Sequence, residues 1–172
     1  MGLDPHAIDP ADIDEAAGTG ETSPRLAVRL AREKAKIVSA RYPQAYVVAA
    51  DTVVAVGRRV LGKPGSRSEA QAMLSLLSGR AHRVLTGVAV AAPDGRLAAR
   101  LSETRVRFKR LTDVEISAYL DSGEWEGKAG AYGVQGRAGA FVIALSGSYT
   151  GVVGLPLYET RALLAGLGYP ER

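Results

Sequence analysis

The sequence predicts a single mixed α/β domain, an α/β or α+β unit that spans residues 1–172. Three observations support this class. A chain of 172 residues is long enough for one domain with a real hydrophobic core. Its hydrophobic content of 47% and charged content of 23% are typical of folded proteins. Segments with helical spacing of apolar residues interleave with strand-like segments along the chain.

The first half of the chain predicts helices, a strand and a hairpin. Residues 1–22 are acidic and irregular, which indicates a loop or an arm. Ser23 is expected to cap a helix with Pro24 at its first position, and Pro43 ends that helix. The other elements expected here are a strand at 46–50, a hairpin turn at 57–59 and a helix at about 68–78.

The second half predicts a long hairpin followed by helices and one more strand. A turn with Pro93 and Gly95 separates two strand-like runs. Thr112 and Glu115 have the spacing of a capping box, so a helix should begin there. The elements expected are strands at 83–91 and 96–108, a helix from 112 to 122, a strand at 140–145 and a helix at about 157–167.

The composition excludes several classes of protein. The chain has no cysteine, which excludes disulfides, zinc–thiolate sites and thiol nucleophiles. No segment reaches the roughly 18 uninterrupted apolar residues that a membrane span needs. The first residues, 1–6, lack the basic and apolar regions of a secretory signal. We therefore expect a cytoplasmic protein with no membrane partner.

The positive charge favours a small anionic ligand over a nucleic acid. The formal net charge is +4, but the basic residues are scattered and only two Phe and one Trp could stack on bases. A basic cleft for an anionic small molecule explains the same charge. We expect no nucleic-acid partner.

Histidines and serines offer neither a metal site nor a nucleophile. His6 and His82 have no partner at metal-ligand spacing, and His82 is expected to serve the structure or the rim of a pocket. Ser146 and Ser148 have no histidine placed to activate them. The segment 146–149 is therefore expected to be a loop.

Asp51 is the strongest candidate for chemistry. It directly follows the apolar run 46–50, at the point where a buried strand should surface. Ligands of open sheets bind beyond the carboxyl ends of the strands. A carboxylate there can orient a metal ion or accept a proton from water, although it could also be a turn acid. Thr52 beside it could donate to a ligand or satisfy a backbone group.

Two lysines are candidates for binding phosphate. Lys63 lies between Gly62 and Pro64, and the proline restricts its backbone to extended geometry. A lysine held in this way binds phosphate as a point charge. Lys34 lies in the middle of the first helix and points partly toward the buried side, where it needs a partner or an anion. The alternatives are a solvated turn lysine for Lys63 and a snorkelling side chain for Lys34.

A glycine-rich loop at 127–139 completes the candidate site. Glycines let backbone N–H groups approach a phosphate or a base closely. Lys128 and Gln135 lie in this loop, and the Gln135 amide could read a base edge. No Walker-type or dinucleotide-binding motif is present. The acid Asp51, the two lysines and the glycine-rich loop together predict a site for a phosphorylated small molecule with a divalent metal.

Several ordered blocks over most of the chain resemble the Maf family of nucleoside triphosphate pyrophosphatases. Because they occur in the same order, the match is more specific than any single motif. The blocks are Ala50-Asp51-Thr52-Val53-Val54, Leu61-Gly62-Lys63-Pro64, the segments 77–88 and 123–136, Gly147-Ser148-Tyr149 and Val153-Gly154-Leu155-Pro156.

The resemblance implies a fold and an activity. The fold would be an elongated mixed sheet with flanking helices, similar to inosine triphosphatases, with two lobes around a cleft and a homodimeric assembly. The activity would be hydrolysis of a nucleotide between its α- and β-phosphates, with Mg²⁺ or Mn²⁺ as the divalent metal. The Asp51–Thr52 pair, with Tyr-Gly-Val-Gln at 132–135, looks like the branch that acts on dTTP and UTP.

The resemblance also implies roles for individual residues. Asp51 matches the proton acceptor, and Glu15 more loosely matches a second acid of the metal site. Thr52 and Gln135 match the positions that select the substrate. The lysines that match phosphate-contacting positions are Lys34 and Lys63.

One family feature is missing from the expected place. Family members begin with an apolar strand that leads into Ser-x-Ser-Pro-Arg-Arg, whereas Ser23-Pro24-Arg25 here is interpreted as a helix cap. We therefore expect a mis-assigned start or a shortened protein, unstable or weakly active. Three alternatives stay open: a non-catalytic nucleotide-binding regulator, a pyrophosphatase for modified purine nucleotides, and a nucleic-acid binder.

Overall fold

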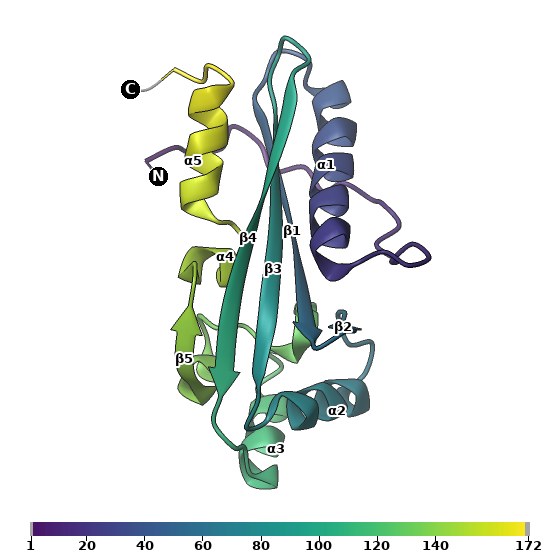
Figure 1. The fold of residues 1–172 in the computed structure, drawn as a ribbon, viewed down its shortest axis with the longest axis vertical. Helices are drawn as coiled ribbons and strands as arrows, with labels where there is room; N and C mark the ends of the chain where they lie inside the picture. Colours follow the sequence, from purple (N-terminus) through teal and green to yellow (C-terminus); the bar gives the residue numbers. More distant parts are fainter. Residues whose placement is uncertain (1, 171–172) are drawn as a thin grey trace.

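The computed structural model describes residues 2–170 of the chain. Its centre is a five-stranded sheet of order β2-β1-β3-β4-β5, flanked by helices (Figure 1). The strands are β1 (Val47–Val56), β2 (Arg59–Leu61), β3 (Ala81–Ala91), β4 (Leu97–Phe108) and β5 (Val142–Ser146). The helices are α1 (Ser23–Arg41), α2 (Arg67–Leu77), α3 (Asp113–Asp121), α4 (Tyr149–Val153) and α5 (Leu157–Gly166), with 3₁₀ turns η1 (Ala129–Ala131) and η2 (Arg137–Phe141).

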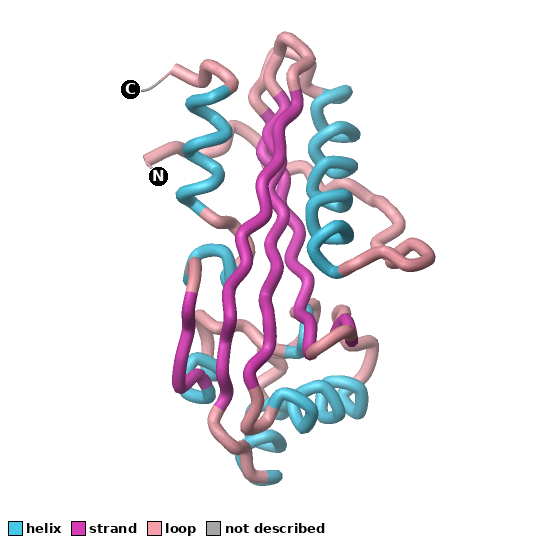
Figure 2. The backbone as a smooth tube through the Cα atoms, viewed as in Figure 1, coloured by secondary structure: helices cyan, strands magenta, loops and turns pink. Residues whose placement is uncertain are grey.

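The long strands β1, β3 and β4 run along the longest axis, so the molecule is elongated (Figure 2). Successive side chains of a strand point to opposite faces, so β3 packs on two different helices. Leu85 and Ala89 face α1, whereas Val88 and Val90 face α5. Within residues 2–170, no helix is long and apolar enough to cross a membrane.

A separate apolar cluster fills the end of the sheet where α2 and α3 lie. Leu74 of α2 and Leu120 of α3 belong to it, together with Phe108 of β4 and Phe141 of η2. The rings of Phe108 and Tyr132 meet edge to face, as do those of Phe108 and Phe141. The two halves of the sheet therefore have separate cores.

The α/β class and the order of the expected helices and strands are confirmed. The capping box of Thr112 and Glu115 begins α3 as expected. α1 begins at Ser23, but the residue at its cap position is Thr22, and no side chain caps the helix. The loop expected at 146–149 is only partly a loop, because the Ser148 hydroxyl caps the short helix α4.

Two details of the sheet differ from expectation. All pairings between its strands, as far as residues 2–170 are concerned, are antiparallel, whereas a mixed sheet was expected. Asp51 lies in the middle of β1 and not at its end. The apolar residues 53–56 continue the strand beyond Asp51, whose backbone pairs with Gly87 and whose charge is matched by an ammonium group.

Candidate functional site

The backbone of β3 lets α1 approach the sheet closely beside Asp51. Asp51 is opposite Gly87 in the register of β1 and β3. A Cβ at Gly87 would lie 2.2 Å from the carbonyl oxygen of Ala27, so only glycine admits the helix there. Lys34 is seven residues, or about two helical turns, after Ala27 and therefore lies on the same side of α1. This packing brings the Lys34 side chain over Asp51.

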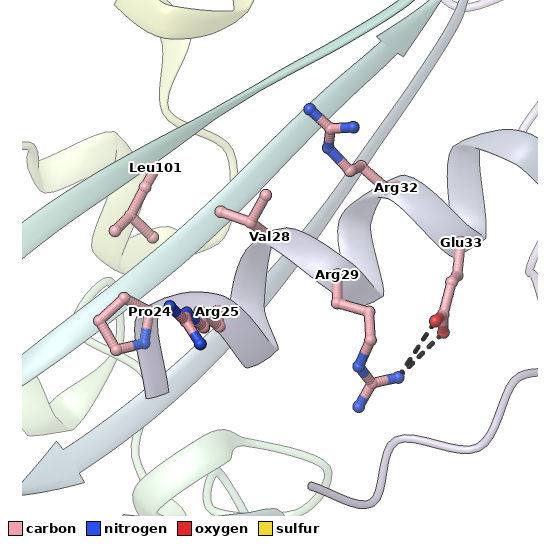
Figure 3. A pocket seen from close by; sticks show the side chains of 7 residues that line it. All are labelled: Pro24, Arg25, Val28, Arg29, Arg32, Glu33 and Leu101. Carbon is pink, nitrogen blue, oxygen red and sulfur yellow. Dashed lines mark hydrogen bonds and ion pairs between the residues drawn. The ribbon is translucent and has the colours of Figure 1, made fainter. Parts of the chain in front are cut away.

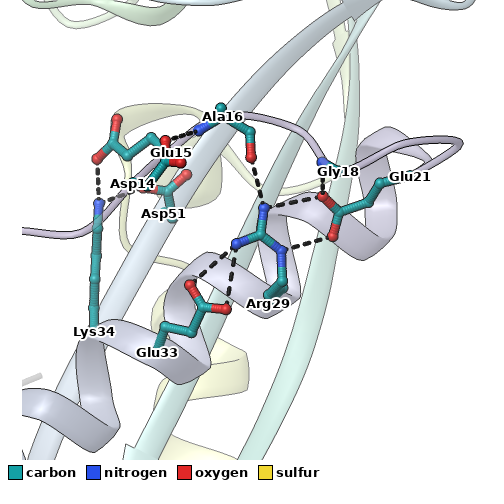
Figure 4. Close-up of polar contacts among 9 residues, drawn as sticks. All are labelled: Asp14, Glu15, Ala16, Gly18, Glu21, Arg29, Glu33, Lys34 and Asp51. Carbon is teal, nitrogen blue, oxygen red and sulfur yellow. Dashed lines mark hydrogen bonds and ion pairs between the residues drawn. The ribbon is translucent and has the colours of Figure 1, made fainter.

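Ion pairs join four segments of the chain at this point. Lys34 Nζ donates to Asp51 Oδ1 at 2.5 Å and to Glu15 Oε1 at 2.7 Å (Figure 4). Lys63 Nζ donates to the other oxygen of the same carboxylate, Glu15 Oε2, at 2.8 Å. The structure thus brings together Asp51, Lys34, Glu15 and Lys63, which we call the charge cluster. These residues come from β1, α1, the N-terminal arm and the turn after β2.

The N-terminal arm is fastened to α1 on both sides of Glu15. Arg29 donates to Glu21 and to the backbone oxygen of Ala16, in both cases at 2.8 Å (Figure 4). Arg41 donates to Asp9 at 2.9 Å. No motif in the sequence predicts these pairs. The only signal was the acidic composition of residues 1–22 beside an arginine-rich helix.

Burial and charge shift the pKa values in opposite directions. Burial raises the pKa of the Asp51 carboxyl, and the hydrogen bond from Lys34 only partly opposes this. Hydrogen bonds from Lys34 and Lys63 lower the pKa of Glu15. Burial alone would lower the pKa of Lys34, but its two carboxylate partners outweigh burial and raise it. A buried carboxylate beside an ammonium is typical of functional sites.

The glycine-rich loop begins against this cluster. The N–H of Gly130 donates to the oxygen of Gly62, next to Lys63, at 3.0 Å. Gly130 has φ +69°, and a Cβ there would lie 3.0 Å from Val54 of β1, so this position requires glycine. Lys128 is exposed just before η1. The contact joins the start of the loop to the turn that carries Lys63.

Thr52 and Gln135 lie outside the charge cluster. Thr52 follows Asp51, so its side chain is on the opposite face of β1. There its hydroxyl lies 3.0 Å from the Thr86 hydroxyl, which donates to the backbone oxygen of Gly151 at 2.7 Å. Gln135 is exposed in the glycine-rich loop. Their roles in selecting the substrate stay predictions.

His82 has a structural environment, as expected. Its side chain is buried, and Nε2 lies 2.8 Å from the hydroxyl of Tyr132. The ring also packs edge to face on Phe108. Burial lowers the pKa of His82 to about 4, so the imidazole is neutral near pH 7. His82 therefore supports the core beneath the glycine-rich loop.

A divalent metal would fit at the charge cluster only together with a phosphate-bearing ligand. Within residues 2–170, no group of three or more His, Asp or Glu side chains is arranged to hold an ion. Asp51 and Glu15 converge on the ammonium of Lys34. Mg²⁺ is commonly held by one or two carboxylates plus substrate phosphates. This pair matches that pattern once phosphate oxygens supply the other ligands.

An open hollow of about 620 Å³ lies beside α1, next to Leu101 of β4, away from the candidate residues (Figure 3). Its lining is formed by Pro24, Arg25, Val28, Arg29, Arg32, Glu33 and Leu101. Arg29 and Glu33 pair with each other there, and no candidate residue lines the hollow. Binding sites need polar groups that converge on the ligand, and the charge cluster has them.

An α/β fold that gathers two carboxylates and two lysines beside a glycine-rich loop defines a candidate site for a phosphate-bearing small molecule. A family model described as Maf-like protein matches residues 1–167. The chain belongs to the Maf family.

Curated relatives support the same assignment. The dTTP/UTP pyrophosphatase of Caulobacter vibrioides is 60% identical over 169 residues, which cover 98% of this chain and 88% of the relative. That of Maricaulis maris is also 60% identical over 169 residues, covering 98% of this chain and 81% of the relative. That of Agrobacterium fabrum is 52% identical over 175 residues, covering 98% and 84%.

Proposed function

We propose that this protein is a nucleoside triphosphate pyrophosphatase that acts on dTTP and UTP. The proposal is supported by the names of relatives that are 60% identical over 98% of this chain. The observation that carries it is the charge cluster. There a buried carboxylate, Asp51, is in contact with one of two lysines that share Glu15.

In the proposed reaction, water attacks the α-phosphorus. Asp51 accepts a proton from that water, and the oxygen that bridges the α- and β-phosphates leaves with pyrophosphate. Lys34 and Lys63 donate to phosphate oxygens and offset their charge. A divalent cation such as Mg²⁺ or Mn²⁺, held by Asp51, Glu15 and phosphate oxygens, would screen the triphosphate.

We propose that the glycine-rich loop recognises the nucleotide base. Gln135 presents both a donor and an acceptor, and Lys128 adds a positive charge at the start of the loop. We propose only a secondary role in selection for Thr52, because its hydroxyl lies on the other face of β1.

Release of pyrophosphate tests the proposal. Purified protein is incubated with dTTP, UTP, dCTP and purine nucleotides, with Mg²⁺ or Mn²⁺ and with chelator. The proposal expects pyrophosphate and the monophosphate from dTTP and UTP. Tight binding without turnover would support a regulator instead, and preference for modified purines would support the other enzyme. Steeply salt-dependent binding of oligonucleotides would indicate a nucleic-acid binder.

The assembly and location are also proposals. A homodimer and a cytoplasmic location are expected from the family resemblance and the composition. Light scattering coupled to size-exclusion chromatography tests the dimer, since a monomer mass at micromolar concentration would contradict it.

A further inference from the structure

The segment around Gln135 has little regular structure of its own. It lies between η1 and η2, and Gly133 and Gly136 flank Gln135 closely. The N–H of Gly136 donates to the oxygen of Gly133 at 3.1 Å, which closes a turn around Gln135. Glycine-rich backbone has many accessible conformations, so contacts from outside the turn must fix it.

Glu124 supplies such a contact on one side of the turn. Its Oε2 accepts the backbone N–H of Arg137 at 2.7 Å, and its Oε1 lies 3.4 Å from Nε of the same arginine. Glu124 comes from the turn after α3, a separate segment of the chain. A carboxylate that accepts a backbone N–H makes a charge-assisted hydrogen bond, stronger than a neutral one.

Gly136 shows how closely this carboxylate approaches the turn. A Cβ at Gly136 would lie 2.1 Å from Glu124 Oε2. The backbone of Gly136 is extended, with φ −104° and ψ −151°, so the conformation itself does not require glycine. The missing side chain therefore leaves room for the Glu124 carboxylate.

The other side of the turn is fixed by the core. The Tyr119 hydroxyl accepts the N–H of Gly133 at 3.3 Å, and the Tyr132 hydroxyl is bonded to the buried His82. Both tyrosines are buried, so this side stays in place without Glu124. Loss of Glu124 would release only the side that follows Gln135.

A free amide cannot distinguish uracil from cytosine. Uracil and thymine present a carbonyl oxygen and an N–H on their pairing edge, and cytosine presents the reverse. A primary amide has both a donor and an acceptor, so a rotation lets it pair with either base. We propose that Glu124 is a positioning residue that fixes the turn around Gln135 and thereby selects thymine and uracil over cytosine. This inference rests on the proposed function and names the source of its base selectivity.

The test compares kcat and KM for dTTP and dCTP in Glu124→Ala, Glu124→Gln and the control Glu126→Gln. Glu126 is exposed on the same turn and is not among the contacts of the loop. Glu124→Ala should lower the dTTP-to-dCTP ratio of kcat/KM roughly tenfold, mainly through KM, as expected for one charge-assisted hydrogen bond. Glu124→Gln keeps an acceptor oxygen and should restore much of the ratio.

Gly136→Ala tests the same contact with a substitution in the glycine-rich loop. Its methyl group would displace the Glu124 carboxylate, so it should lower the ratio about as much as Glu124→Ala. In the Glu124→Ala background the methyl group meets no carboxylate. The double variant should therefore resemble Glu124→Ala, which is strong non-additivity. Additive losses would overturn the proposal.

Two further readouts keep the inference separate from the proposed function. Hydrogen exchange of the Arg137 amide should be faster in Glu124→Ala than in Glu124→Gln or the control. Dissociation constants for dTTP and dCTP give the selectivity without turnover. If the wild-type protein releases no pyrophosphate, the proposed function fails, while these constants still test the role of the contact between Glu124 and Arg137. An unchanged ratio in Glu124→Ala, or a loss of kcat shared equally by both nucleotides, would overturn the inference.

Discussion

Asp51 and Thr52 are neighbours in the chain, but they face different environments on the two sides of β1. The Asp51 face carries the charge cluster, in which each ammonium or carboxylate contacts an opposite charge. The Thr52 face carries neutral groups: the hydroxyls of Thr52 and Thr86, and farther along β3 the neutral imidazole of His82. Side chains of adjacent strand residues point apart, which separates the two environments.

The difference indicates how the two faces contribute. Charges at the Asp51 face lie near an irregular arm and an exposed turn. In the proposed function, phosphate oxygens there take the place of a carboxylate as the partner of a lysine. At the opposite face Thr86 and His82 are buried, and each has a hydrogen-bond partner, Thr52 for Thr86 and Tyr132 for His82, so these groups stabilise the fold. We therefore expect substitutions on the first face to change activity, whereas those on the second should change stability with little effect on activity.

The largest expected effect is that of Asp51→Asn. The amide keeps the size of the side chain but cannot accept a proton, so kcat should fall about a hundredfold or more, as for loss of one catalytic electrostatic group. The measurement is pyrophosphate release from dTTP at saturating substrate. Asp113→Asn, an exposed change in the first turn of α3, is the matched control. Full activity in Asp51→Asn would remove Asp51 from the mechanism.

The second prediction concerns the stability of the protein in acid and the role of His82, which lies on the Thr52 face of the sheet. Burial lowers the pKa of His82 to about 4 from its ordinary value of 6.5. Between pH 4 and pH 6.5, therefore, His82 binds a proton in the unfolded chain but not in the folded chain. The free energy of unfolding should fall as the pH is lowered from 6.5 to 4, by roughly 2 to 3 kcal/mol in total from this group.

Urea unfolding at a series of pH values measures this loss. In His82→Gln, which keeps a hydrogen-bonding group for Tyr132, the decline between pH 6.5 and 4 should be shallower than in the wild type. His6→Gln is the control, because His6 is exposed. Parallel profiles for wild type and His82→Gln would show that folding does not lower the pKa of His82.

The third prediction compares the two lysines of the charge cluster. Lys34 has two carboxylate partners and a side chain 17% exposed, whereas Lys63 has one partner and is 54% exposed. Lys34→Met should lower the free energy of unfolding by about 3 kcal/mol, because it leaves the buried Asp51 carboxylate unpaired. Lys63→Met should cost less than about 1 kcal/mol, as for an exposed ion pair.

Both lysine variants should raise KM for dTTP, because each removes a donor to phosphate. Thermal or urea unfolding and steady-state kinetics on the same preparations separate the two effects. Equal loss of stability in the two variants would contradict the assignment of Lys34 to a buried contact.

Local patterns predicted the secondary structure well, because they depend on neighbouring residues. The capping box at Thr112 and the hairpin turn near Gly57 are of this kind. The prediction that Asp51 ends a strand was wrong, because a single charged residue was taken to mark the strand end. Its pairing with Lys34 depends on Gly87, which admits α1, and only the packed structure shows that.

The site was predicted in part for the same reason. Local context indicated Asp51, Lys34 and Lys63 as candidates, and the family resemblance added Glu15. The structure brings these four residues together, and their roles stay predictions. The contact between Glu124 and Arg137 joins residues thirteen apart across irregular backbone. No periodicity marks such a contact, so it could not be predicted from the sequence.

The smallest expected effect is that of Thr52→Val, which removes the Thr52 hydroxyl from the Thr52 face of β1. Thr86 keeps its bond to Gly151, so the free energy of unfolding should fall by only about 1 kcal/mol. Since the hydroxyl lies away from the charge cluster, kcat/KM for dTTP should change less than about threefold, well below the effect of losing an electrostatic catalytic group. Thr52→Ser retains the hydroxyl and is the control for both measurements. A tenfold change in the preference for dTTP over dCTP in Thr52→Val, with Thr52→Ser unaffected, would place this hydroxyl in contact with the base. The two faces of β1 would then share one site.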